Sequence, residues 1–336
     1  MLRSKDVQTL SWKTADGKPP IVRVPEFDDI KGACEWLETV RPELADAMRD
    51  YGAAYLRGLP LEDVEDFALV RDVLLATPTP YREKATPRSK LGRDVFSSTD
   101  LPPTQAIHLH NENSYTLTFP GVLLFGCLVA PPEGGATPVA DCRKVLSMLP
   151  QDFVAEMRSV GWLLTRSYSE FLSTTWQAAF STDERTEVEQ YCQDNLIGYQ
   201  WQADGNLTTR QLRPGVITHP RNGEEVWFNH LAFWNEWSLD EELREVLIAE
   251  CGHDRLPFNT AMGNGRPLTR AEVHVLRAAY AHATVREPWR KGDLLMVDNI
   301  LTAHGRDPFH GDRRIVVAMG DPVSIADCRP TVSPAA

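Results

Sequence analysis

His110 and Glu112 stand two residues apart in the segment HLHNENSY, a spacing that suits metal binding. In a β-strand, residues i and i+2 point to the same side, so this pattern brings an imidazole and a carboxylate together. A second imidazole from a distant strand would complete the two-histidine, one-carboxylate set that holds non-haem Fe(II) and leaves positions open for a co-substrate and O₂. The motif therefore predicts a mononuclear iron site.

The His-x-acid pattern is not specific by itself. Nine histidines in a chain of 336 residues with 47 acidic residues give about one accidental match. A second match exists in His310 and Asp312, but no histidine follows Asp312. Seven histidines follow Glu112, so only the first pair can take its third ligand from downstream.

His304 is the strongest candidate for that third ligand. It follows the strand-like segment 292–298 and precedes Arg313 and Arg314. The co-substrate 2-oxoglutarate carries two carboxylates, and a guanidinium binds a carboxylate through two parallel hydrogen bonds. A histidine ligand with an arginine about ten residues later meets both needs. Without the arginines, His304 is more simply interpreted as a structural histidine.

Apolar spacing and turn signals predict the elements that must position these residues. A helical region over residues 27–50 is expected to break at Pro42, because proline cannot continue the hydrogen-bond ladder. Capping boxes are expected to start two later helices. These boxes pair Ser238 with Glu241, and Thr269 with Glu272. Further helices are expected at 61–76, 143–158 and 184–196, and strands at 53–59, 122–129, 198–230, 292–298 and 315–320.

Residues 77–103 are rich in proline and show little periodicity, which predicts a long ordered loop. Residues 81–93 within it carry five basic side chains and one acid. Such a run is either a solvated face or a surface that contacts anions.

Composition excludes several classes of protein. The net charge of −12 and the pI near 5.3 argue against a nucleic-acid-binding protein, whose surface would be basic. Six cysteines without a CxxC pair indicate neither a zinc cage nor a disulfide framework. The N-terminus lacks the apolar core of a signal peptide, and the longest apolar run is too short for a membrane span. These features predict a reduced, cytoplasmic protein without a membrane segment.

The chain shows no repeat, low-complexity tract or linker. We therefore expect one domain over residues 1–336, with a β core at roughly 20–325 and helices packed outside it. A region at 160–237 is expected to form an insertion or lid next to that core. The strand pattern alone does not distinguish a barrel from a sandwich.

Five stretches carry a wider pattern than the metal motif. They are YGAAYLRGLP (51–60), ATPRSKLGRDVFSSTDLPPTQAIHLHNENSY (85–115), GGATPVADCRKVL (134–146), THPRNGEEVWFNHLAF (218–233) and WRKGDLLMVDNILTAHGRDPFHGDRRIVVAMGD (289–321). Together they resemble the taurine dioxygenase (TauD/TfdA) family of iron(II)- and 2-oxoglutarate-dependent oxygenases. Within that family, they look most like the SyrP-like branch of amino-acid hydroxylases of natural-product (antibiotic) biosynthesis. The resemblance implies a mainly β fold with flanking helices, whose core is a double-stranded β-helix, the jelly roll of cupin-like proteins.

Carried over by position, the resemblance implies that His110, Glu112 and His304 bind the iron. The halogenating relatives lack the carboxylate ligand and hold chloride in its place, so Glu112 implies a hydroxylase-type outcome. His108 lies two residues before His110 and is expected on the same strand face, either as a further imidazole near the metal or packed beneath the site.

The resemblance also implies a site for 2-oxoglutarate. Thr137, in GGATP, matches the threonine that helps to hold the distal carboxylate, and the family arginine falls at Arg313 or Arg314. Arg313 is preferred because aligning it keeps the strand at 315–320 in register. The arginine with which taurine dioxygenase binds its sulfonate is replaced by Val317 or Ala318, so taurine is not an expected substrate.

The implied activity uses Fe(II), 2-oxoglutarate and O₂ to hydroxylate an unactivated C–H bond, with release of succinate and CO₂. The expected substrate is an amino-acid-like small molecule, free or tethered to an acidic carrier protein. Desaturation, epoxidation or cyclisation at the same site remain alternatives. Candidate substrate contacts are Arg88, Ser114, Tyr115, His230 and Arg306.

Two readings from other classes stay open at this point. A zinc metallohydrolase could use the same three ligands, although it would leave Thr137 and the paired arginines without a role. A non-catalytic binding module could use the basic loop to dock a partner, although an inactive relative would be expected to lack a ligand. The oligomeric state is left open by the sequence.

Overall fold

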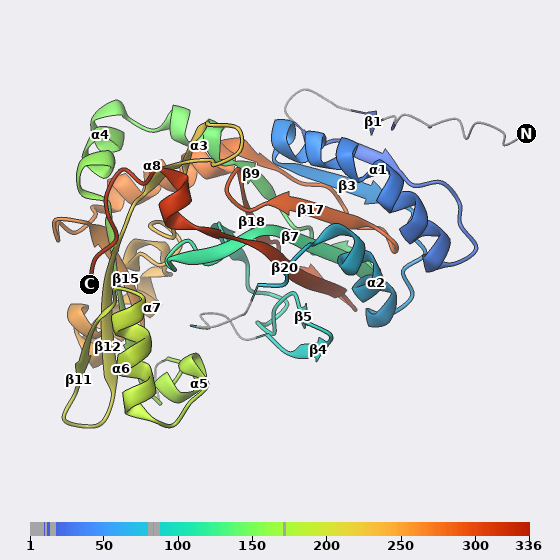
Figure 1. Ribbon diagram of the computed structural model, residues 1–336. Helices are drawn as coiled ribbons and strands as arrows, with labels where there is room; N and C mark the ends of the chain where they lie inside the picture. The colour runs from blue at the N-terminus through green and yellow to red at the C-terminus, as the bar shows by residue number, and fades with distance from the viewer. Residues whose placement is uncertain (1–9, 11, 14–17, 80–82, 84–87, 171–172) are drawn as a thin grey trace, which may run out of the picture.

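The computed structural model describes residues 10, 12–13, 18–79, 83, 88–170 and 173–336 (Figure 1). Its helices are α1 (Ile30–Tyr51), α2 (Val64–Leu74), α3 (Cys142–Met148), α4 (Gln151–Val160), α5 (Trp176–Phe180), α6 (Arg185–Asp194), α7 (Glu241–Cys251) and α8 (Arg270–Ala283). Short 3-10 turns are η1 (Glu236–Ser238), η2 (His253–Arg255) and η3 (Ile325–Cys328). Among the described helices, none combines the length and apolarity that crossing a bilayer requires.

An eight-stranded sheet forms the larger wall of the core. In spatial order it contains β1 (Trp12–Lys13), β2 (Ile21–Arg23), β3 (Ala53–Arg57), β17 (Leu294–Asp298), β7 (Thr118–Val129), β20 (Arg314–Ser324), β5 (Val95–Ser97) and β4 (Lys90–Gly92). All neighbours are antiparallel except β2 and β3. Strands from both ends of the chain therefore lie side by side (Figure 1).

A four-stranded sheet forms the smaller wall and carries the two candidate histidine ligands. Its order is β16 (Thr284–Val285), β9 (Val139–Asp141), β18 (Thr302–Arg306) and β6 (Ile107–His110). The pair β8 (Glu133–Gly134) and β19 (Phe309–His310) closes one corner. Val139 of this smaller sheet packs in one cluster with Phe125 and Leu295 of the larger one, so the two sheets enclose a common core.

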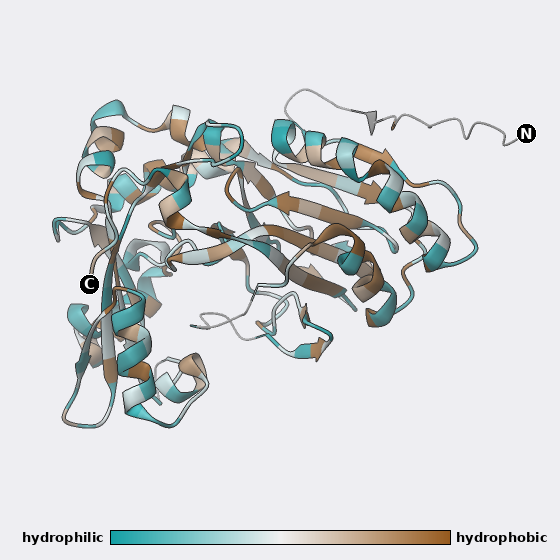
Figure 2. Ribbon diagram, in the orientation of Figure 1, coloured by the Kyte–Doolittle hydropathy of each residue, from teal (hydrophilic) through white to brown (hydrophobic). Residues whose placement is uncertain are grey.

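The alternation along β7 explains how the larger sheet is buried on both faces. Leu123 and Phe125 point into the space between the sheets, whereas Leu124 contributes to the cluster under α1 and α2. Gly126 is required by close approach, because a Cβ there would lie 2.4 Å from the ring of Phe67 in α2. The brown central strands in Figure 2 reflect this two-sided burial, which a sequence displays as a continuous apolar run.

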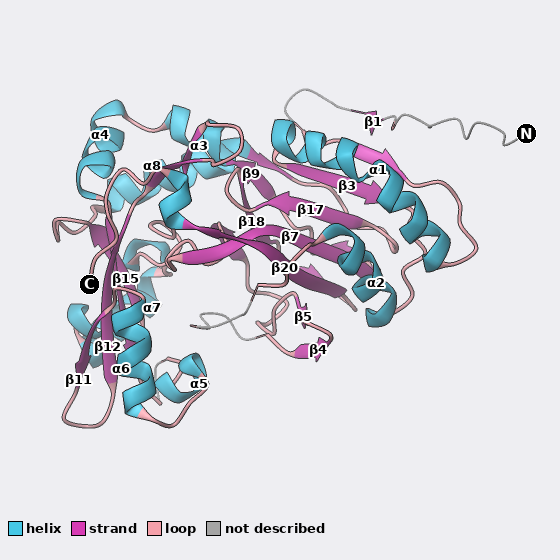
Figure 3. Ribbon diagram, viewed as in Figure 1, coloured by secondary structure: helices cyan, strands magenta, loops and turns pink. Residues whose placement is uncertain are grey.

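A second layer of structure lies beside the smaller sheet. It contains a four-stranded antiparallel sheet, of which Figure 3 labels β11, β12 and β15, and a separate two-stranded hairpin. The sheet order is β11 (Gly198–Trp201), β12 (Leu207–Arg213), β10 (Trp162–Tyr168) and β15 (Phe258–Met262), and the hairpin is β13 (Val216–Thr218) with β14 (Glu225–Trp227). Because β15 pairs with β10, this sheet reaches beyond the 160–237 region.

Three local predictions are wrong. Helix α1 does not break at Pro42, because the exposed ring lies on the solvent side while Leu37 and Leu44 hold the helix against the sheet. The 77–103 loop contains the hairpin β4–β5, whose turn residues Arg93 and Asp94 both have positive φ. Two-residue hairpin turns favour Asn-Gly or Asp-Gly at these positions, so the pair Arg93–Asp94 after Gly92 is a weak hairpin signal.

The third concerns the start of α7. The N-cap is Asp240, which accepts the backbone N–H groups of Glu242 and Leu243, and Ser238 instead donates its hydroxyl to the carbonyl of Ala232. The predicted capping box of Thr269 and Glu272 at the start of α8 is confirmed.

Candidate metal centre

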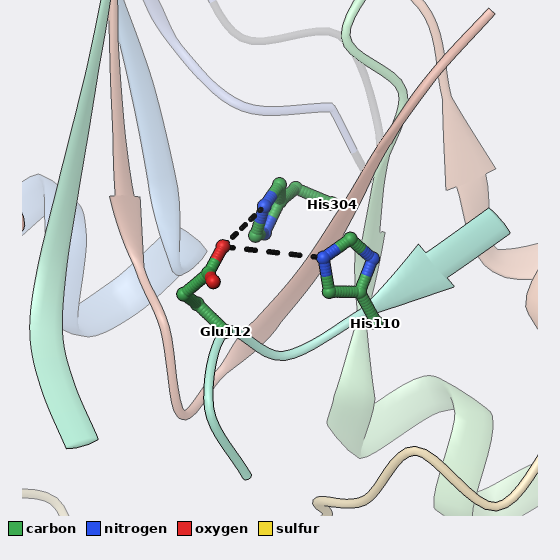
Figure 4. Close-up of side chains that lie close together, drawn as sticks. All are labelled: His110, Glu112 and His304. Atoms are coloured by element: carbon green, nitrogen blue, oxygen red, sulfur yellow. Dashed lines mark ion pairs between the residues drawn. The ribbon is translucent and has the colours of Figure 1, made fainter. Parts of the chain in front are cut away.

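The three candidate ligands converge at the edge of the smaller sheet. His110 ends β6 and lies directly opposite His304 of β18 in the antiparallel register. The Oε2 atom of Glu112 lies 3.7 Å from Nε2 of His304 and 4.0 Å from Nε2 of His110. Figure 4 shows this one oxygen directed at both rings. Among the described residues, these three are the group of metal-ligating type whose ligand atoms all lie within 4.8 Å of one another.

The position of Glu112 differs from the expectation that His-x-Glu lies on one strand. Strand β6 ends at His110, and Glu112 belongs to the turn that follows, with Asn113 at a φ of 54°. The backbone N–H and carbonyl of Glu112 bond to the side chain of Asn299 rather than to a neighbouring strand. The buried side chain of Asn299 therefore takes the place of the strand-to-strand hydrogen bonds that the His-x-Glu pattern predicts for Glu112.

Both imidazoles are in the form that a metal requires. Nδ1 of His110 donates to the backbone carbonyl of His108 at 2.8 Å, which leaves Nε2 as the unprotonated nitrogen facing Glu112. Burial lowers the pKa of His110 and lowers the pKa of His304 well below the ordinary histidine value. Two neutral imidazoles and one carboxylate, all buried, fit a divalent transition metal.

His108 does not share the face of His110, contrary to the prediction. The register pairs His304 with His110 but Arg306 with Ile107, so β6 has one extra residue between these pairs. This bulge turns Ile107 toward the interior and leaves His108 exposed beside Phe233. An i, i+2 count cannot detect a bulge.

Arg88 contacts the candidate metal-binding carboxylate of Glu112. Its Nη2 donates to Oε2 of Glu112 at 2.6 Å, and both side chains are almost fully buried. Arg88, a candidate substrate contact, here neutralises the carboxylate of Glu112. The two residues are 24 positions apart, and no local sequence pattern indicates that they pair.

A cavity adjoins the two histidines and is lined by three guanidinium groups. Arg88 is paired with Glu112, whereas Arg306 and Arg313 have no acidic partner among the described lining residues. The lining residues are Arg88, Ser98, Thr99, Ile107, His110, Phe125, Thr137, His304, Gly305, Arg306 and Arg313. A cavity of this charge favours a small anion with carboxylate groups.

Arg313 and Thr137 lie together in this cavity. Nε of Arg313 donates to the carbonyl of Gly135 at 2.9 Å, Nη1 donates to Oγ of Ser98 at 3.0 Å, and Nη2 lies 3.4 Å from Oγ1 of Thr137. Burial lowers the pKa of Arg313 to about 10, with the nearby positive charge of Arg306 acting in the same direction.

Arg314 has a different environment from its neighbour. It begins β20 and is exposed to solvent, and it does not line the cavity. Because adjacent strand residues point to opposite sides, the two arginines cannot both enter the same pocket.

Arg306 lines the cavity, and its guanidinium group is bonded to backbone carbonyls of the cavity wall. Its Nη1 and Nη2 donate to the backbone carbonyls of Leu101, Pro102 and Gln105 at 2.6–3.0 Å. Arg306 is 4% exposed, so the segment 101–105 is fixed against β18 by a buried cation.

Ser114, Tyr115 and His230 form a buried network next to the metal ligands. Oγ of Ser114 lies 2.6 Å from Nδ1 of His230, whose ring centroid is 5.2 Å from that of His110. The hydroxyl of Tyr115 donates to the carbonyl of Glu83 and to Oδ1 of Asn113, both at 3.1 Å. None of the three lines the arginine-rich cavity.

The second His-x-acid match is not brought to this site. His310 and Asp312 are both exposed.

Other residues near the candidate ligands lack any sequence signal. Phe233 and Phe125 pack against the rings of His110 and His304 at centroid distances of 4.7 and 5.2 Å. Aromatic residues are common in any core, so their types alone did not single them out.

Comparisons with known proteins agree with this geometry. A family model described as taurine catabolism dioxygenase TauD, TfdA family, matches residues 22–319. The dapdiamide synthesis protein DdaC of Enterobacter agglomerans is 37% identical over 276 residues, which cover 82% of this chain and 84% of that protein.

Two solved structures share the fold. AAD-2 in complex with Mn(II) and N-oxalylglycine superposes with a TM-score of 0.53 at 15% identity, covering 96% of this chain and 100% of that one. PvcB, an Fe, alpha-ketoglutarate dependent oxygenase from an isonitrile synthetic pathway, gives 0.50 at 15% identity, covering 95% and 93%. The expected jelly-roll core with flanking helices is confirmed by these likenesses.

Proposed function

The chain belongs to the TauD/TfdA family of dioxygenases, and from this premise we propose that it hydroxylates an unactivated C–H bond of an amino-acid-like small molecule. Iron, 2-oxoglutarate and O₂ are the cofactor and co-substrates of this class of enzyme. The observation that carries the proposal is the buried His110–Glu112–His304 group beside a cavity lined by three arginines.

His110, Glu112 and His304 are proposed to hold the iron on one face. When bound, the iron supplies the oxidising chemistry that couples decarboxylation of 2-oxoglutarate, to succinate and CO₂, with transfer of an oxygen atom to the substrate. The chain itself supplies orientation, charge neutralisation and a site from which water is largely excluded.

Arg313 and Thr137 are proposed to bind the distal carboxylate of 2-oxoglutarate. The three nitrogens of Arg313 are already oriented by Gly135, Ser98 and Thr137, so little rotamer entropy is lost when the anion enters. The exposure of Arg314 supports assigning this role to Arg313 alone.

The substrate class is proposed from two observations. The relative from Enterobacter agglomerans is named for dapdiamide synthesis, which places a similar protein in a biosynthetic pathway. In addition, Val317 and Ala318 are buried apolar residues of β20, so this strand offers no cation there for a sulfonate such as that of taurine.

Five polar side chains around the ligands are proposed substrate contacts. They are Arg88, Ser114, Tyr115, His230 and Arg306. Arg88 and the Ser114–His230 pair lie nearest to the metal ligands and are the first to test. Presentation of the substrate by an acidic carrier protein is a further part of the proposal. This part follows from the SyrP-like resemblance, and the basic segment 81–93, whose charge would suit an acidic carrier, lies partly outside the described residues.

A coupled product screen tests the proposed function. Free amino acids and carrier-loaded aminoacyl thioesters are incubated with the enzyme, Fe(II), 2-oxoglutarate and O₂, and succinate is compared with substrate mass. We expect one compound class to raise succinate formation and to gain the mass of one oxygen atom. A loss of two hydrogens would instead select desaturation.

The matched controls are His110→Ala and His304→Ala, which should lose both succinate and product. Full turnover in either variant would overturn the ligand assignment. Hydrolysis of a substrate without O₂ consumption would overturn the oxygenase proposal in favour of a metallohydrolase.

A further inference from the structure

Asn299 is a fully buried polar residue in the turn between β17 and β18, five residues before His304. Its side chain makes three hydrogen bonds to backbone groups. Oδ1 accepts the N–H of Glu112 at 2.7 Å, while Nδ2 donates to the carbonyl of Glu112 at 2.9 Å and to that of Pro120 at 2.8 Å. The Asn299 amide thus bonds to both the N–H and the carbonyl of Glu112, a proposed metal ligand.

Asn111, next to Glu112 in the turn after β6, bonds in turn to Asn299. Its Nδ2 donates to the backbone carbonyl of Asn299 at 2.7 Å, and Asn111 is also fully buried. Two asparagines, 188 positions apart, therefore lock the turn after β6 to the turn before β18. These two turns carry Glu112 and lead into His304, respectively.

Other residues of the turn that carries Glu112 have restraints of their own, since Ser114 bonds to His230 and Thr116 bonds to the carbonyl of Asn113. Asn113 follows Glu112 with a φ of 54°, a conformation that costs free energy for a residue other than glycine. The carboxylate of Glu112 is held by Arg88, but its backbone groups bond to Asn299.

The turn that carries Asn299 is itself rigid. Asp298, 1% exposed, accepts the N–H groups of Ile300 and Leu301 through Oδ1. Its Oδ2 lies 3.1 Å from Nε2 of the buried His219 and 3.3 Å from Nη2 of Arg221. Asn299 therefore extends from a turn that is fixed independently of the metal ligands.

We propose that Asn299 is a positioning residue that sets the place of the Glu112 carboxylate relative to His304 before metal binds. This inference rests on the proposed metal centre and assigns a role within it to a residue that is not a ligand. Because the side chain joins the two ligand-bearing segments directly, its loss should loosen Glu112 while leaving both histidines on their strands.

The first test uses metal-free protein, so it does not depend on activity. Hydrogen–deuterium exchange of the peptide that contains Glu112 is compared between wild type and Asn299→Ala. We expect exchange at this peptide to accelerate by about 10-fold or more, because the Glu112 N–H loses its acceptor and the turn its anchor. Unchanged protection of that peptide would overturn the proposal.

The second test measures the affinity for Mn(II) alone, followed by loss of the free-ion EPR signal. Asn299→Ala should weaken Mn(II) binding by about 10- to 100-fold, the usual effect of removing a residue that orients a metal ligand. Asn299→Asp keeps the side-chain volume and one acceptor but cannot donate to the two carbonyls, so it should also weaken binding.

Asn235→Ala is the matched control. Asn235 is 2% exposed, and the three hydrogen bonds of its side chain join it to Thr260 and Trp237 rather than to the candidate ligands. It should lower thermal stability but leave Mn(II) affinity and Glu112 exchange unchanged. Equal Mn(II) affinity in wild type and both Asn299 variants would overturn the proposal. Failure of the wild type to bind Mn(II), or undiminished binding by His304→Ala, would instead count against the metal centre itself.

Discussion

Arg313 and Arg314 differ by one position in sequence and by their whole environment in the structure. The guanidinium of Arg313 is held in the cavity by Gly135, Ser98 and Thr137, while Arg314 faces solvent. Arg313→Gln should raise the KM for 2-oxoglutarate by about 10- to 100-fold, because hydrogen bonds to charged groups contribute about 1.5–3 kcal/mol. Initial rates at varied 2-oxoglutarate concentration measure this effect.

Arg314→Gln removes the same charge one residue later and serves as the control for that measurement. Its KM for 2-oxoglutarate should match that of wild type. Equal increases in both variants would mean that net charge, rather than a specific contact, attracts the co-substrate.

The buried histidines predict how the metal-free protein responds to pH. Burial lowers the pKa of His110, His230 and His304 below 6.5, whereas in the unfolded chain each has an ordinary value. Between the lowered pKa and 6.5, the unfolded state binds protons that the folded state does not. Stability should therefore fall as pH is lowered through this window, by up to about 1.4 kcal/mol per pH unit for each histidine.

Thermal unfolding of metal-free protein from pH 7 downward measures this dependence. His230→Gln should flatten the curve, because it removes one of the three groups. His274→Gln changes an exposed residue of α8 and should reproduce the wild-type curve. A stability that is independent of pH below 6.5 would contradict neutral burial of these imidazoles.

At the scale of residues, the sequence indicated the candidate metal ligands well but did not indicate the side chains that hold these ligands in place. His110 and His304 were found because histidine is rare in this chain and each stands in a recognisable context, His110 before Glu112 and His304 before Arg313. Arg88 and Asn299, which touch Glu112 from distant segments, were not assigned to it. Asparagine and arginine are common surface residues, and only the folded chain shows which ones are buried beside a ligand.

At the scale of elements, the β6–β18 pair decides whether the two histidines meet. Gly305 lies between His304 and Arg306 in β18, opposite the bulge in β6, and a Cβ there would lie 2.5 Å from the backbone carbonyl oxygen of Ile107. Gly305→Ala should destabilise the fold by about 1–3 kcal/mol, the usual range for overpacking against atoms that cannot move away. Urea unfolding measures this loss, and Mn(II) affinity should fall with it.

Gly198→Ala is the control, since a Cβ on this strand residue meets its nearest atom at 3.4 Å. It should cost less than the change at Gly305 and should leave Mn(II) affinity unchanged. A Gly305→Ala variant with wild-type stability would show that the two strands can separate without harm to the fold.

Elements were predictable where periodicity was strong. The apolar run at 122–129 is a central strand, β7, because both its faces are covered. Local rules failed where the surroundings outweighed them. Packing on the sheet keeps α1 helical through Pro42. The β4–β5 turn places Arg93 and Asp94, rather than glycine, at its two central positive-φ positions, directly after Gly92.

At the scale of the whole molecule, the site exists only because distant segments converge. The ligand pair at 110–112 and the strand at 302–306 are joined across one sheet, with the cavity wall at 134–137 and the arginine at 313 beside them. No local pattern specifies that convergence. The order of family motifs along the chain supplied it, which is why the resemblance predicted the jelly roll and periodicity alone did not.

The central claim is that His110, Glu112 and His304 hold one iron ion beside bound 2-oxoglutarate. Its most direct test is the visible absorption spectrum of the metal-free protein titrated without oxygen with Fe(II) and 2-oxoglutarate. The wild type should develop a metal-to-ligand charge-transfer band, which Arg314→Gln should keep and His304→Ala should lose. A folded wild type without the band, or a band of full intensity in His304→Ala, would contradict the claim.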